Sequence, residues 1–359
     1  MKGLKMKKML QAKLVDLEKI KLENVPIPDV GKEEVLIEIK TCGICGSDIH
    51  AYRGEHPFVL PPIVLGHEFS GIICRLDSKS NNLKEGDRVT VEPNIVCGNC
   101  YNCLNGRYNI CCNLKVIGCV GHNGAFAEYI AVPKDKVIKL PYEVSFEDAA
   151  LVEPTAVAIH AVRKSEQKIG DRILILGAGT IGLLVLQVAK LAGAEEVVIT
   201  DLRDYRLKKA KEFGADKVLN PINEDIFSYI KNNYGSDGID LIYDCVAIEE
   251  TYSQSIRIAR KGTKIIIVGV PEGSMNVNLA YVQDRELELI GTLMYTKKDF
   301  YTALEFIRRQ KIQVSPLVTH KFKLREIEKA FQFLTKEREE FFKILIFVFV
   351  SLFQNPMHF

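Results

Sequence analysis

The stretch DRILILGAGTIGL, residues 171–183, constrains the fold of this 359-residue chain more than any other. The apolar run RILILG leads directly into the turn GAGTIG, whose glycines are Gly177, Gly179 and Gly182, and an apolar helical pattern follows. Glycines at these positions permit a tight turn and the close approach of a pyrophosphate, which the free N–H groups at a helix N-terminus stabilise. The stretch therefore predicts the strand–turn–helix unit of a Rossmann dinucleotide-binding domain.

Strands and helices alternate after this turn. VVIT, KVLN, GIDLIYDC, KIIIVGV and LELIGT are the expected strands, and helices are expected between them. Apolar strands separated by helices of about ten residues are typical of a parallel sheet covered on both faces. Asp201 directly follows VVIT, where a carboxylate accepts hydrogen bonds from both adenosine ribose hydroxyls and repels a 2′-phosphate. This favours NAD over NADP, although Arg203 and Arg206 are cations that would accommodate a phosphate.

The first 150 residues show a different pattern. Short alternating segments such as EVLIEIK, SGIICRL, DRVTVEP and AEYIAV, separated by Gly, Pro, Asn and Asp, predict strands and turns. No long helical pattern precedes residue 145, where Ser145 is a candidate N-cap for a helix through Lys164. From about Met294 the chain returns to mixed helix and strand. We predict an α/β protein with a β-rich catalytic domain at 1–152, a Rossmann doubly wound parallel sheet at 153–293, and a return to the first domain at 294–359.

Composition and charge argue against several classes of partner. The chain is 47% hydrophobic and 26% charged with a net charge of +2, which gives no electrostatic reason to expect nucleic acid or an anionic membrane. Its Lys-rich start lacks the apolar stretch of a signal peptide, so we expect a cytoplasmic protein. The apolar stretch 341–353 is shorter than the ~20 residues of a spanning helix. We interpret it as a buried strand around Lys343–Val348 with an apolar tail.

Ten cysteines in a chain without an export signal favour metal binding over disulfides. Four of them, Cys97, Cys100, Cys103 and Cys111, lie in the loop CGNCYNCLNGRYNICC. Four thiolates close a tetrahedral shell around zinc without an open position, which is typical of a structural site. We predict a structural zinc here, with free or redox-active thiols as the alternative. Cys112 is left out because adjacent side chains do not easily both point inward.

A second candidate zinc site is spread along the sequence. It comprises Cys45 in CGICGSDIH, His67 and Glu68 in LGHEFSG, and Glu153 in LVEPTAV. A catalytic zinc has three protein ligands and one position for water or substrate, and a thiolate, an imidazole and a carboxylate supply that shell. Zinc lowers the pKa of a bound alcohol, so that an alkoxide forms near neutral pH and expels a hydride. Taken singly these residues are unremarkable, but together with the four-Cys loop and the dinucleotide motif they predict a catalytic zinc site.

The chain resembles the zinc-containing medium-chain alcohol dehydrogenase family over nearly its whole length, through GICGSDIH, GHEFSG, GDRV, GAFAEY, LVEP and GAGTIG. The LVEP motif is most similar to the polyol branch typified by sorbitol (L-iditol 2-) dehydrogenase. The resemblance implies a GroES-like catalytic domain, a Rossmann domain and a homotetramer. It also implies Cys45, His67 and Glu153 as ligands of the catalytic zinc, Glu153 binding directly or through water, with Glu68 as a neighbouring or exchanging carboxylate.

The same resemblance assigns roles around the substrate and the cofactor. Ser47 aligns with a hydroxyl that contacts the reacting oxygen, and His50 with a histidine that relays its proton to solvent. A surface histidine without a relay role is the alternative for His50. Asp48 would orient the metal site. Around NAD the resemblance adds to the glycines and Asp201 the residues Ile181, Arg206, Val268, Gly269, Val270, Leu293, Met294 and Tyr295.

Substrate choice is less constrained by the sequence. Ala51 and Met294 stand where the sorbitol enzymes have Tyr and Arg, which implies a more apolar pocket suited to a diol or a simple secondary alcohol. Cys119 and His122 are expected to line the cleft passively. We expect reversible NAD-linked oxidation of a secondary alcohol or polyol to a ketone. Butanediol or threonine dehydrogenase activity, or a non-catalytic NAD-binding relative, are the alternatives. The ending VSLFQNPMHF extends beyond the usual end of the family and is unexplained.

Overall fold

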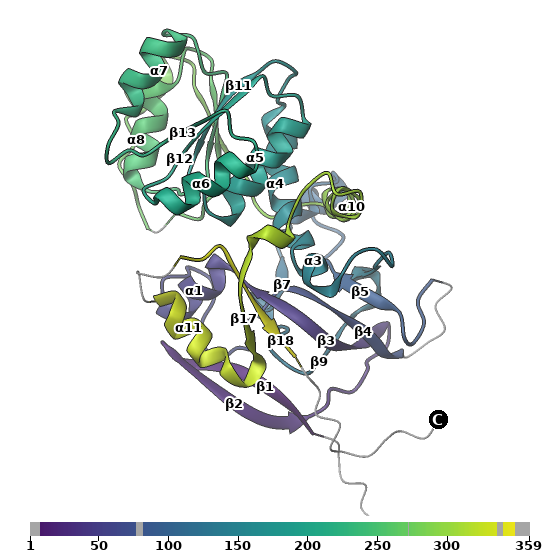
Figure 1. The fold of residues 1–359 in the computed structure, drawn as a ribbon. Coiled ribbons are helices and arrows are strands. Elements are labelled where there is room, and N and C mark those ends of the chain that lie inside the picture. Colours follow the sequence, from purple (N-terminus) through teal and green to yellow (C-terminus); the bar gives the residue numbers. More distant parts are fainter. Residues whose placement is uncertain (1–7, 77–81, 272, 336–339, 349–359) are drawn as a thin grey trace, which may run out of the picture. The chain divides into compact units, whose positions relative to one another are not determined.

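The computed structural model describes residues 8–76, 82–271, 273–335 and 340–348, and the chain divides into two compact units (Figure 1). The first unit is Met1–Glu153 with Gln313–Phe359, and the second is Pro154–Ile312. The return to the first unit therefore comes at Gln313 rather than at Met294. The N-terminal Lys-rich segment through residue 7 and the extension VSLFQNPMHF lie outside the described residues.

Helix α10 (Lys297–Arg308) explains the later boundary, because it packs within the second unit. Its buried Asp299 accepts a hydrogen bond from Arg163 at 2.5 Å and lies 3.0 Å from Nδ1 of His160. Both partners belong to α4 (Val152–Ser165). A periodic apolar pattern identifies α10 as a helix, but these long-range contacts decide which unit it joins.

The first unit is β-rich, as predicted, and its main sheet has the strand order β10–β5–β4–β3–β18–β17, with β9 also paired to β3. The strands of this sheet are β3 (Glu34–Ile44), β4 (Glu68–Leu76), β5 (Arg88–Val91), β9 (Tyr129–Pro133), β10 (Val137–Lys139), β17 (Val318–Lys323) and β18 (Lys343–Phe347). Strand β18 pairs antiparallel with β3, opposing Ile346 to Cys42. The predicted C-terminal strand therefore lies beside an N-terminal strand that leads into the candidate metal site.

Two smaller sheets and four helices complete the first unit. The small sheets are formed by β1 (Lys8–Asp16) with β2 (Lys19–Pro26), and by β6 (Asn94–Ile95), β7 (Lys115–Ile117) and β8 (Gly121–His122). The helices are α1 (Gly46–Arg53), α2 (Tyr101–Leu104), α3 (Phe146–Ala150) and α11 (Ile327–Thr335). Apolar side chains from β1, β3, β4 and α11 share one core, which includes Phe69, Phe126 and Phe331.

The predicted helix from Ser145 to Lys164 is two helices, α3 and α4, because the chain breaks its helical run at Leu151. Ser145 is the N-cap of α3, as predicted, and its Oγ accepts a hydrogen bond from the Asp148 backbone N–H at 3.0 Å. The break starts a new helix at Val152. Glu153 consequently lies in the first turn of α4, where it is buried.

The second unit is a Rossmann fold with a six-stranded parallel sheet in the order β13–β12–β11–β14–β15–β16. This is the strand order of a dinucleotide-binding doubly wound sheet. Its strands are β11 (Arg172–Leu176), β12 (Glu196–Thr200), β13 (Lys217–Leu219), β14 (Leu241–Asp244), β15 (Lys264–Ile267) and β16 (Glu288–Gly291).

Helices cover both faces of this sheet, as the apolar strands predict. They are α5 (Thr180–Leu191), α6 (Asp204–Glu212), α7 (Ile226–Tyr234), α8 (Glu249–Ile258) and α9 (Leu279–Asp284), besides α4 and α10. Figure 1 shows α5 and α6 on one side of the sheet, and α7 and α8 on the other. Strand β11 lies between them with Ile173, Leu174 and Ile175 fully buried.

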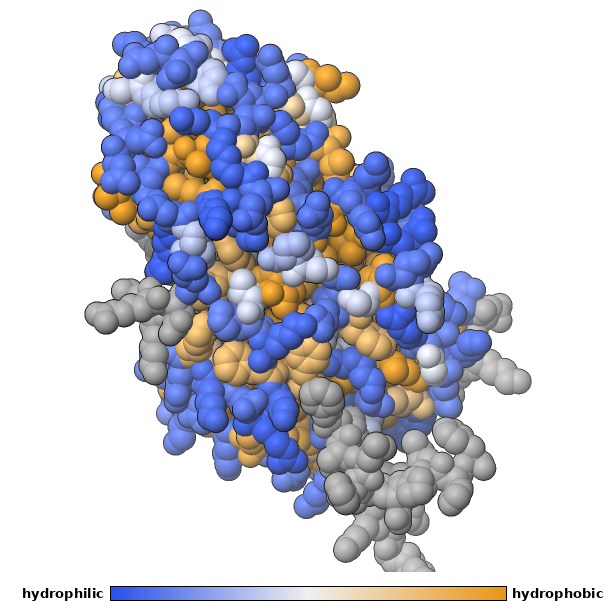
Figure 2. Space-filling model, viewed as in Figure 1, coloured by the Kyte–Doolittle hydropathy of each residue, from blue (hydrophilic) through white to orange (hydrophobic). Residues whose placement is uncertain are grey.

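The surface of the described residues is partly hydrophilic and partly apolar. Figure 2 shows hydrophilic residues over most of the visible face, with apolar residues interspersed among them. Among the described residues, no helix combines the length and the apolar character needed to cross a membrane.

Replacement of Ser145 tests the capping of α3. Ser145→Ala removes the acceptor for the Asp148 N–H, so we expect the free energy of unfolding to fall by about 1 kcal/mol. Ser145→Thr keeps the hydroxyl, so its free energy of unfolding should fall by less than half as much. Urea denaturation of the three proteins checks this, and equal losses in both variants would show that the cap is not the stabilising contact.

Candidate metal and cofactor sites

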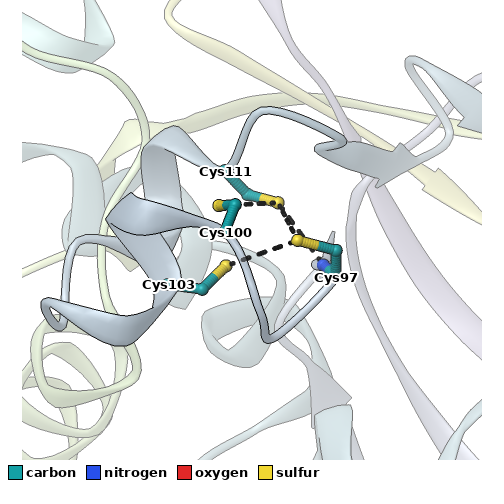
Figure 3. A group of neighbouring side chains, drawn as sticks. All are labelled: Cys97, Cys100, Cys103 and Cys111. Atoms are coloured by element: carbon teal, nitrogen blue, oxygen red, sulfur yellow. Dashed lines mark hydrogen bonds between the residues drawn. The ribbon is translucent and has the colours of Figure 1, made fainter.

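The four-Cys loop between β6 and β7 brings four thiols together, as the sequence predicts (Figure 3). The sulfur atoms of Cys97, Cys100, Cys103 and Cys111 all lie within 4.8 Å of one another. The Sγ of Cys97 is 3.4 Å from that of Cys111 and 4.0 Å from that of Cys103. Thiolates around a tetrahedral zinc at 2.3 Å are about 3.8 Å apart. The thiols are therefore spaced to hold one zinc.

Backbone N–H groups point at these sulfurs and stabilise thiolate. The N–H groups of Cys103 and Cys112 lower the pKa of Cys100 to about 5. The Asn99 N–H is the largest cause lowering the pKa of Cys97. The Cys111 Sγ accepts from the N–H groups of Cys97 and Asn113 at 3.4 and 3.3 Å. Cys112 itself is exposed and does not belong to the four-sulfur group.

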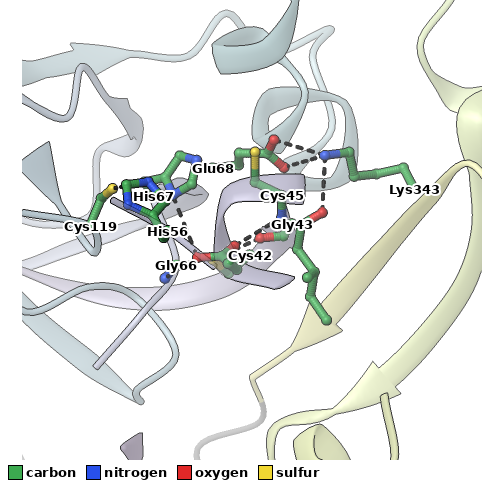
Figure 4. Close-up of polar contacts among 11 residues, drawn as sticks. Cys42, Gly43, Cys45, His56, Gly66, His67, Glu68, Cys119 and Lys343 are labelled. Atoms are coloured by element: carbon green, nitrogen blue, oxygen red, sulfur yellow. Dashed lines mark hydrogen bonds and ion pairs between the residues drawn. The ribbon is translucent and has the colours of Figure 1, made fainter. Parts of the chain in front are cut away.

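The second cluster forms where the beginnings of α1 and β4 meet in the first unit (Figure 4). Cys45 is the N-cap of α1, His67 precedes β4, and Glu68 is the first residue of β4. One ligand atom of each lies within 4.8 Å of the others. His67 and Glu68 are buried. A thiol, an imidazole and a carboxyl gathered in this way can hold a divalent metal.

Asp48 contacts this cluster directly. Its carboxylate accepts the Cys45 N–H at 2.9 Å and the Gly66 N–H at 3.4 Å, and lies 3.7 Å from Nδ1 of His67. That nitrogen is buried without a hydrogen bond among the described residues. Because Nδ1 faces Asp48, Nε2 is the nitrogen expected to bind a metal, an arrangement common to zinc-ligating histidines.

The cluster is strongly negative. Burial lowers the pKa of His67, but the negative charges of Asp48, Cys45 and Glu153 more than offset this and raise it well above its usual value. Burial also raises the pKa of Asp48 to about 6. Buried anionic groups are costly unless a cation pairs with them. The environment of His67 therefore suits a bound cation, which fits a zinc site.

Lys343, which no sequence motif singles out, is central to this cluster. Its Nζ donates to both carboxylate oxygens of Glu68, at 2.8 and 2.7 Å, and to the Ile44 carbonyl at 3.1 Å. Lys343 and Glu68 are 4% and 1% exposed. The signal was a lone Lys in the otherwise apolar strand KILIF, since a buried lysine needs an anionic partner. Gly43 makes room for the pair, because a Cβ there would lie 2.2 Å from Glu68 Oε2.

The remaining predicted residues of this site lie close by. Among the described residues, Glu153 is not in the group within 4.8 Å, but its charge acts on both His67 and Lys343. Ser47 and His50 are three residues apart on α1 and so share one helix face. Nδ1 of His50 is 3.4 Å from a Glu55 carboxylate oxygen. Ala51 is fully buried in the core of the first unit.

The glycine turn of the second unit lies between β11 and α5, as predicted. Gly177 has φ +93°, a conformation that other residues rarely adopt, and its N–H donates to the Thr200 carbonyl at 2.9 Å. A Cβ on Gly182 would lie 1.9 Å from the Gly177 carbonyl oxygen. Gly179 is the N-cap of α5, with Ile181 in its first turn. The N-terminus of α5 therefore begins directly at the glycine turn, where a pyrophosphate site requires it.

Asp201 lies at the carboxyl end of β12, next to this turn. Its carboxylate accepts the N–H of Ala178 at 2.9 Å and that of Arg203 at 3.0 Å. Nη1 of Arg206 is 3.4 Å from the same carboxylate. The acidic residue and the arginine are therefore paired beside the glycine turn.

The other predicted cofactor residues follow the carboxyl ends of β15 and β16, which share this edge of the parallel sheet. The N–H groups of Val268 and Gly269 donate to the Asp244 carbonyl at 2.9 and 3.0 Å. Val270 and Leu293 are exposed, and Met294 has φ +50°. The Tyr295 side chain is instead fully buried against Phe300, with ring centroids 5.6 Å apart.

Two family models match this chain. An alcohol dehydrogenase GroES-like domain matches residues 31–142, and a zinc-binding dehydrogenase domain matches residues 180–309. Sorbitol dehydrogenase of Bacillus subtilis is 33% identical, over 94% of this chain and 97% of its own length. L-Idonate 5-dehydrogenase of Vitis vinifera is 36% identical, over 90% of each chain.

The fold shows the same relationship. The crystal structure of 2R,3R-butanediol dehydrogenase from Bacillus subtilis superposes with a TM-score of 0.86 and 32% identity, covering 94% of this chain and 99% of that one. The two domain models match separate parts of the chain, and the relatives and the solved structure each cover at least 90% of it. The chain belongs to the family of zinc-binding medium-chain dehydrogenases with a GroES-like alcohol dehydrogenase domain.

Proposed function

We propose that this chain is a zinc-dependent dehydrogenase that reversibly oxidises a secondary alcohol, diol or polyol to a ketone, with NAD as the hydride acceptor. The observation that carries the proposal is the buried cluster of Cys45, His67 and Glu68, whose negative environment suits a divalent cation. The Rossmann unit, with its glycine turn, supports a dinucleotide as the second reactant.

Cys45, His67 and Glu153 are our candidates for the catalytic zinc ligands, Glu153 acting directly or through a water molecule. Lys343 holds both oxygens of Glu68, which leaves that carboxylate less available to the metal than Glu153. When bound, zinc lowers the pKa of an alcohol substrate so that the oxygen gives up its proton near neutral pH. Asp48 holds the imidazole of His67 in the orientation that presents Nε2.

Ser47 and His50 supply a route for the proton that alcohol oxidation releases. They lie on one face of α1, which begins directly after Cys45. The Ser47 hydroxyl accepts the proton of the reacting oxygen as it donates its own onward, and His50 passes the proton toward Glu55 and solvent. Both side chains are half-buried, which supports a route between the site and solvent.

NAD is proposed over NADP because of Asp201. Its carboxylate lies beside the glycine turn and is suited to ribose hydroxyls rather than to a phosphate. Arg206 is paired with this carboxylate, which reduces the positive charge available to a 2′-phosphate. Ile181, Val268, Gly269, Val270, Leu293, Met294 and Tyr295 are proposed as further cofactor contacts.

A second zinc at the four-Cys loop is proposed to be structural. It has four thiolates and therefore no position for substrate. We also propose a cytoplasmic homotetramer. All ten cysteines are free, which suits a reducing compartment, and the tetramer rests on the family resemblance.

Metal content separates the roles of the two glutamates. We expect zinc in the purified wild type at about two per chain, falling to about one in Glu153→Gln because a ligand of the open site is lost. Glu68→Gln should keep about two, since Glu68 is assigned to Lys343 rather than to the metal. Elemental analysis by mass spectrometry checks both. Loss of zinc in Glu68→Gln alone would reverse the assignment.

Cys103→Ser tests the structural site. Opening the closed shell should release this zinc and lower the melting temperature by about 5 °C or more, because metal binding contributes to folding. Cys112→Ser is the matched control, since that exposed thiol lies outside the four-sulfur group and its loss should leave the melting temperature unchanged. A stable Cys103→Ser protein that retains its zinc would contradict the assignment.

Cofactor choice is tested at Asp201. Asp201→Ala should shift the ratio of kcat/KM for NAD over NADP at least about tenfold toward NADP, because a charged hydrogen-bond acceptor for the ribose is lost. Asp201→Asn keeps an oxygen acceptor for the Ala178 N–H while removing the charge, and should shift the ratio in the same direction. An unchanged ratio in both variants would refute the assignment of NAD selectivity to this residue.

A further inference from the structure

His56 lies beside the metal cluster, and its ring is fixed by the loop that follows α1. The backbone N–H groups of Glu55 and His56 both donate to the His50 carbonyl, at 2.8 and 3.2 Å. Nδ1 of His56 accepts the Phe58 N–H at 3.1 Å. Figure 4 shows His56 near His67 and Cys119. The loop thus attaches the imidazole to α1, which carries Ser47 and His50.

These contacts determine which ring nitrogen carries the proton. Because Nδ1 accepts a hydrogen bond, the neutral ring has its hydrogen on Nε2. Burial, and then the charges of His50 and His67, lower the pKa of His56, which favours this neutral form. Nε2 therefore presents a hydrogen-bond donor on the side of the ring that faces Cys119.

The Nε2–H has only a weak partner among the described residues. It is 3.8 Å from the Sγ of Cys119, whose pKa is raised to about 11, chiefly by burial, so that the sulfur is a neutral thiol. A thiol sulfur is a weak acceptor compared with an oxygen. The donor next to the metal cluster is therefore available to an oxygen of a bound molecule.

We propose that His56 Nε2–H binds a second, uncharged oxygen of the substrate, so that the enzyme prefers diols and polyols to alcohols with one hydroxyl. This inference rests on the proposed function, because it places the reacting oxygen at the catalytic metal site. It makes His56 a specificity-determining residue, and the substrate oxygen would replace the Cys119 sulfur as the acceptor of its Nε2–H.

The charge around the site supports an uncharged substrate. A neutral imidazole donates one hydrogen bond but does not compensate a carboxylate or a phosphate. Phe58 and Leu60, in the same loop as His56, are 76% and 78% exposed and add apolar surface for a carbon chain. An alcohol with one hydroxyl would leave the Nε2–H with only the weak sulfur acceptor of Cys119, which disfavours that substrate.

Two variants distinguish the roles of the two ring nitrogens of His56. His56→Asn retains an acceptor near the position of Nδ1 for the Phe58 N–H but has no donor at the position of Nε2. His56→Gln reaches further and supplies an N–H there. Both keep a polar side chain of similar shape, so the pair controls for general disturbance of the loop.

The experiment compares 2,3-butanediol and xylitol with 2-butanol, using the full-length, zinc-loaded protein and NAD. We expect the wild type to have a higher kcat/KM for the diol or the polyol than for 2-butanol. This preference should fall about tenfold in His56→Asn, the effect of losing one hydrogen bond, and be retained within about threefold in His56→Gln. Calorimetric titration of the NADH-bound proteins with the same compounds should show the same order of affinities.

The outcomes distinguish this inference from the proposed function. If the wild type oxidises 2-butanol as efficiently as the diol and the polyol, or if His56→Asn keeps the wild-type preference, the role of His56 is overturned while the dehydrogenase assignment stands. Equal loss of preference in the Asn and Gln variants also overturns it. If the wild type oxidises none of the three compounds, the proposed function itself fails.

Discussion

Buried negative charge around His67 is the constraint on which the rest of the site depends. Cys45, Asp48 and Glu68 come from a helix N-terminus, a helix and a strand, and Glu153 adds its charge from the start of α4. Such charges are tolerated in a protein interior only when cations accompany them. The chain supplies one cation itself, Lys343, which bonds both oxygens of Glu68. The remaining negative charge is what a divalent metal would compensate, and the fold brings β18 back to β3 so that this balance can form.

The two units divide the chemistry between them. The first has the two candidate metal sites and the candidate proton route, and the second has the glycine turn at the carboxyl edge of its parallel sheet. In each unit a glycine leaves space that a Cβ would fill. Gly43 leaves room for the Glu68 side chain, and Gly182 leaves room for the Gly177 carbonyl. The four-Cys loop, in contrast, has no open position and is suited to holding the loop together. Because these three sites use different residues, the metal, cofactor and stability assignments can be tested independently.

The sequence predicts the parts that depend on local pattern. Apolar strands separated by helices identify the Rossmann sheet, and the spacing of Cys97 to Cys111 identifies the four-sulfur group. The sequence does not predict contacts made by residues far apart in the chain. The helix expected from Ser145 to Lys164 breaks at a buried Leu151, and the helix at 297–308 joins the second unit through Asp299. Lys343 is 275 residues from Glu68, so only the fold reveals that a lysine in an apolar strand has a buried partner.

Zinc-edge X-ray absorption of the purified protein tests the central claim most directly, because it reports the atoms bound to the metal. Two sites of the proposed kinds, one with four sulfurs and one with a single sulfur and otherwise nitrogen and oxygen, predict an average of about 2.5 sulfurs per zinc, with the remainder N or O at about 2.0–2.1 Å. Glu153→Gln should move this average toward four sulfurs as the mixed site empties. A wild-type shell of four sulfurs, with no nitrogen or oxygen, would show that only the four-Cys loop binds zinc and would contradict the account.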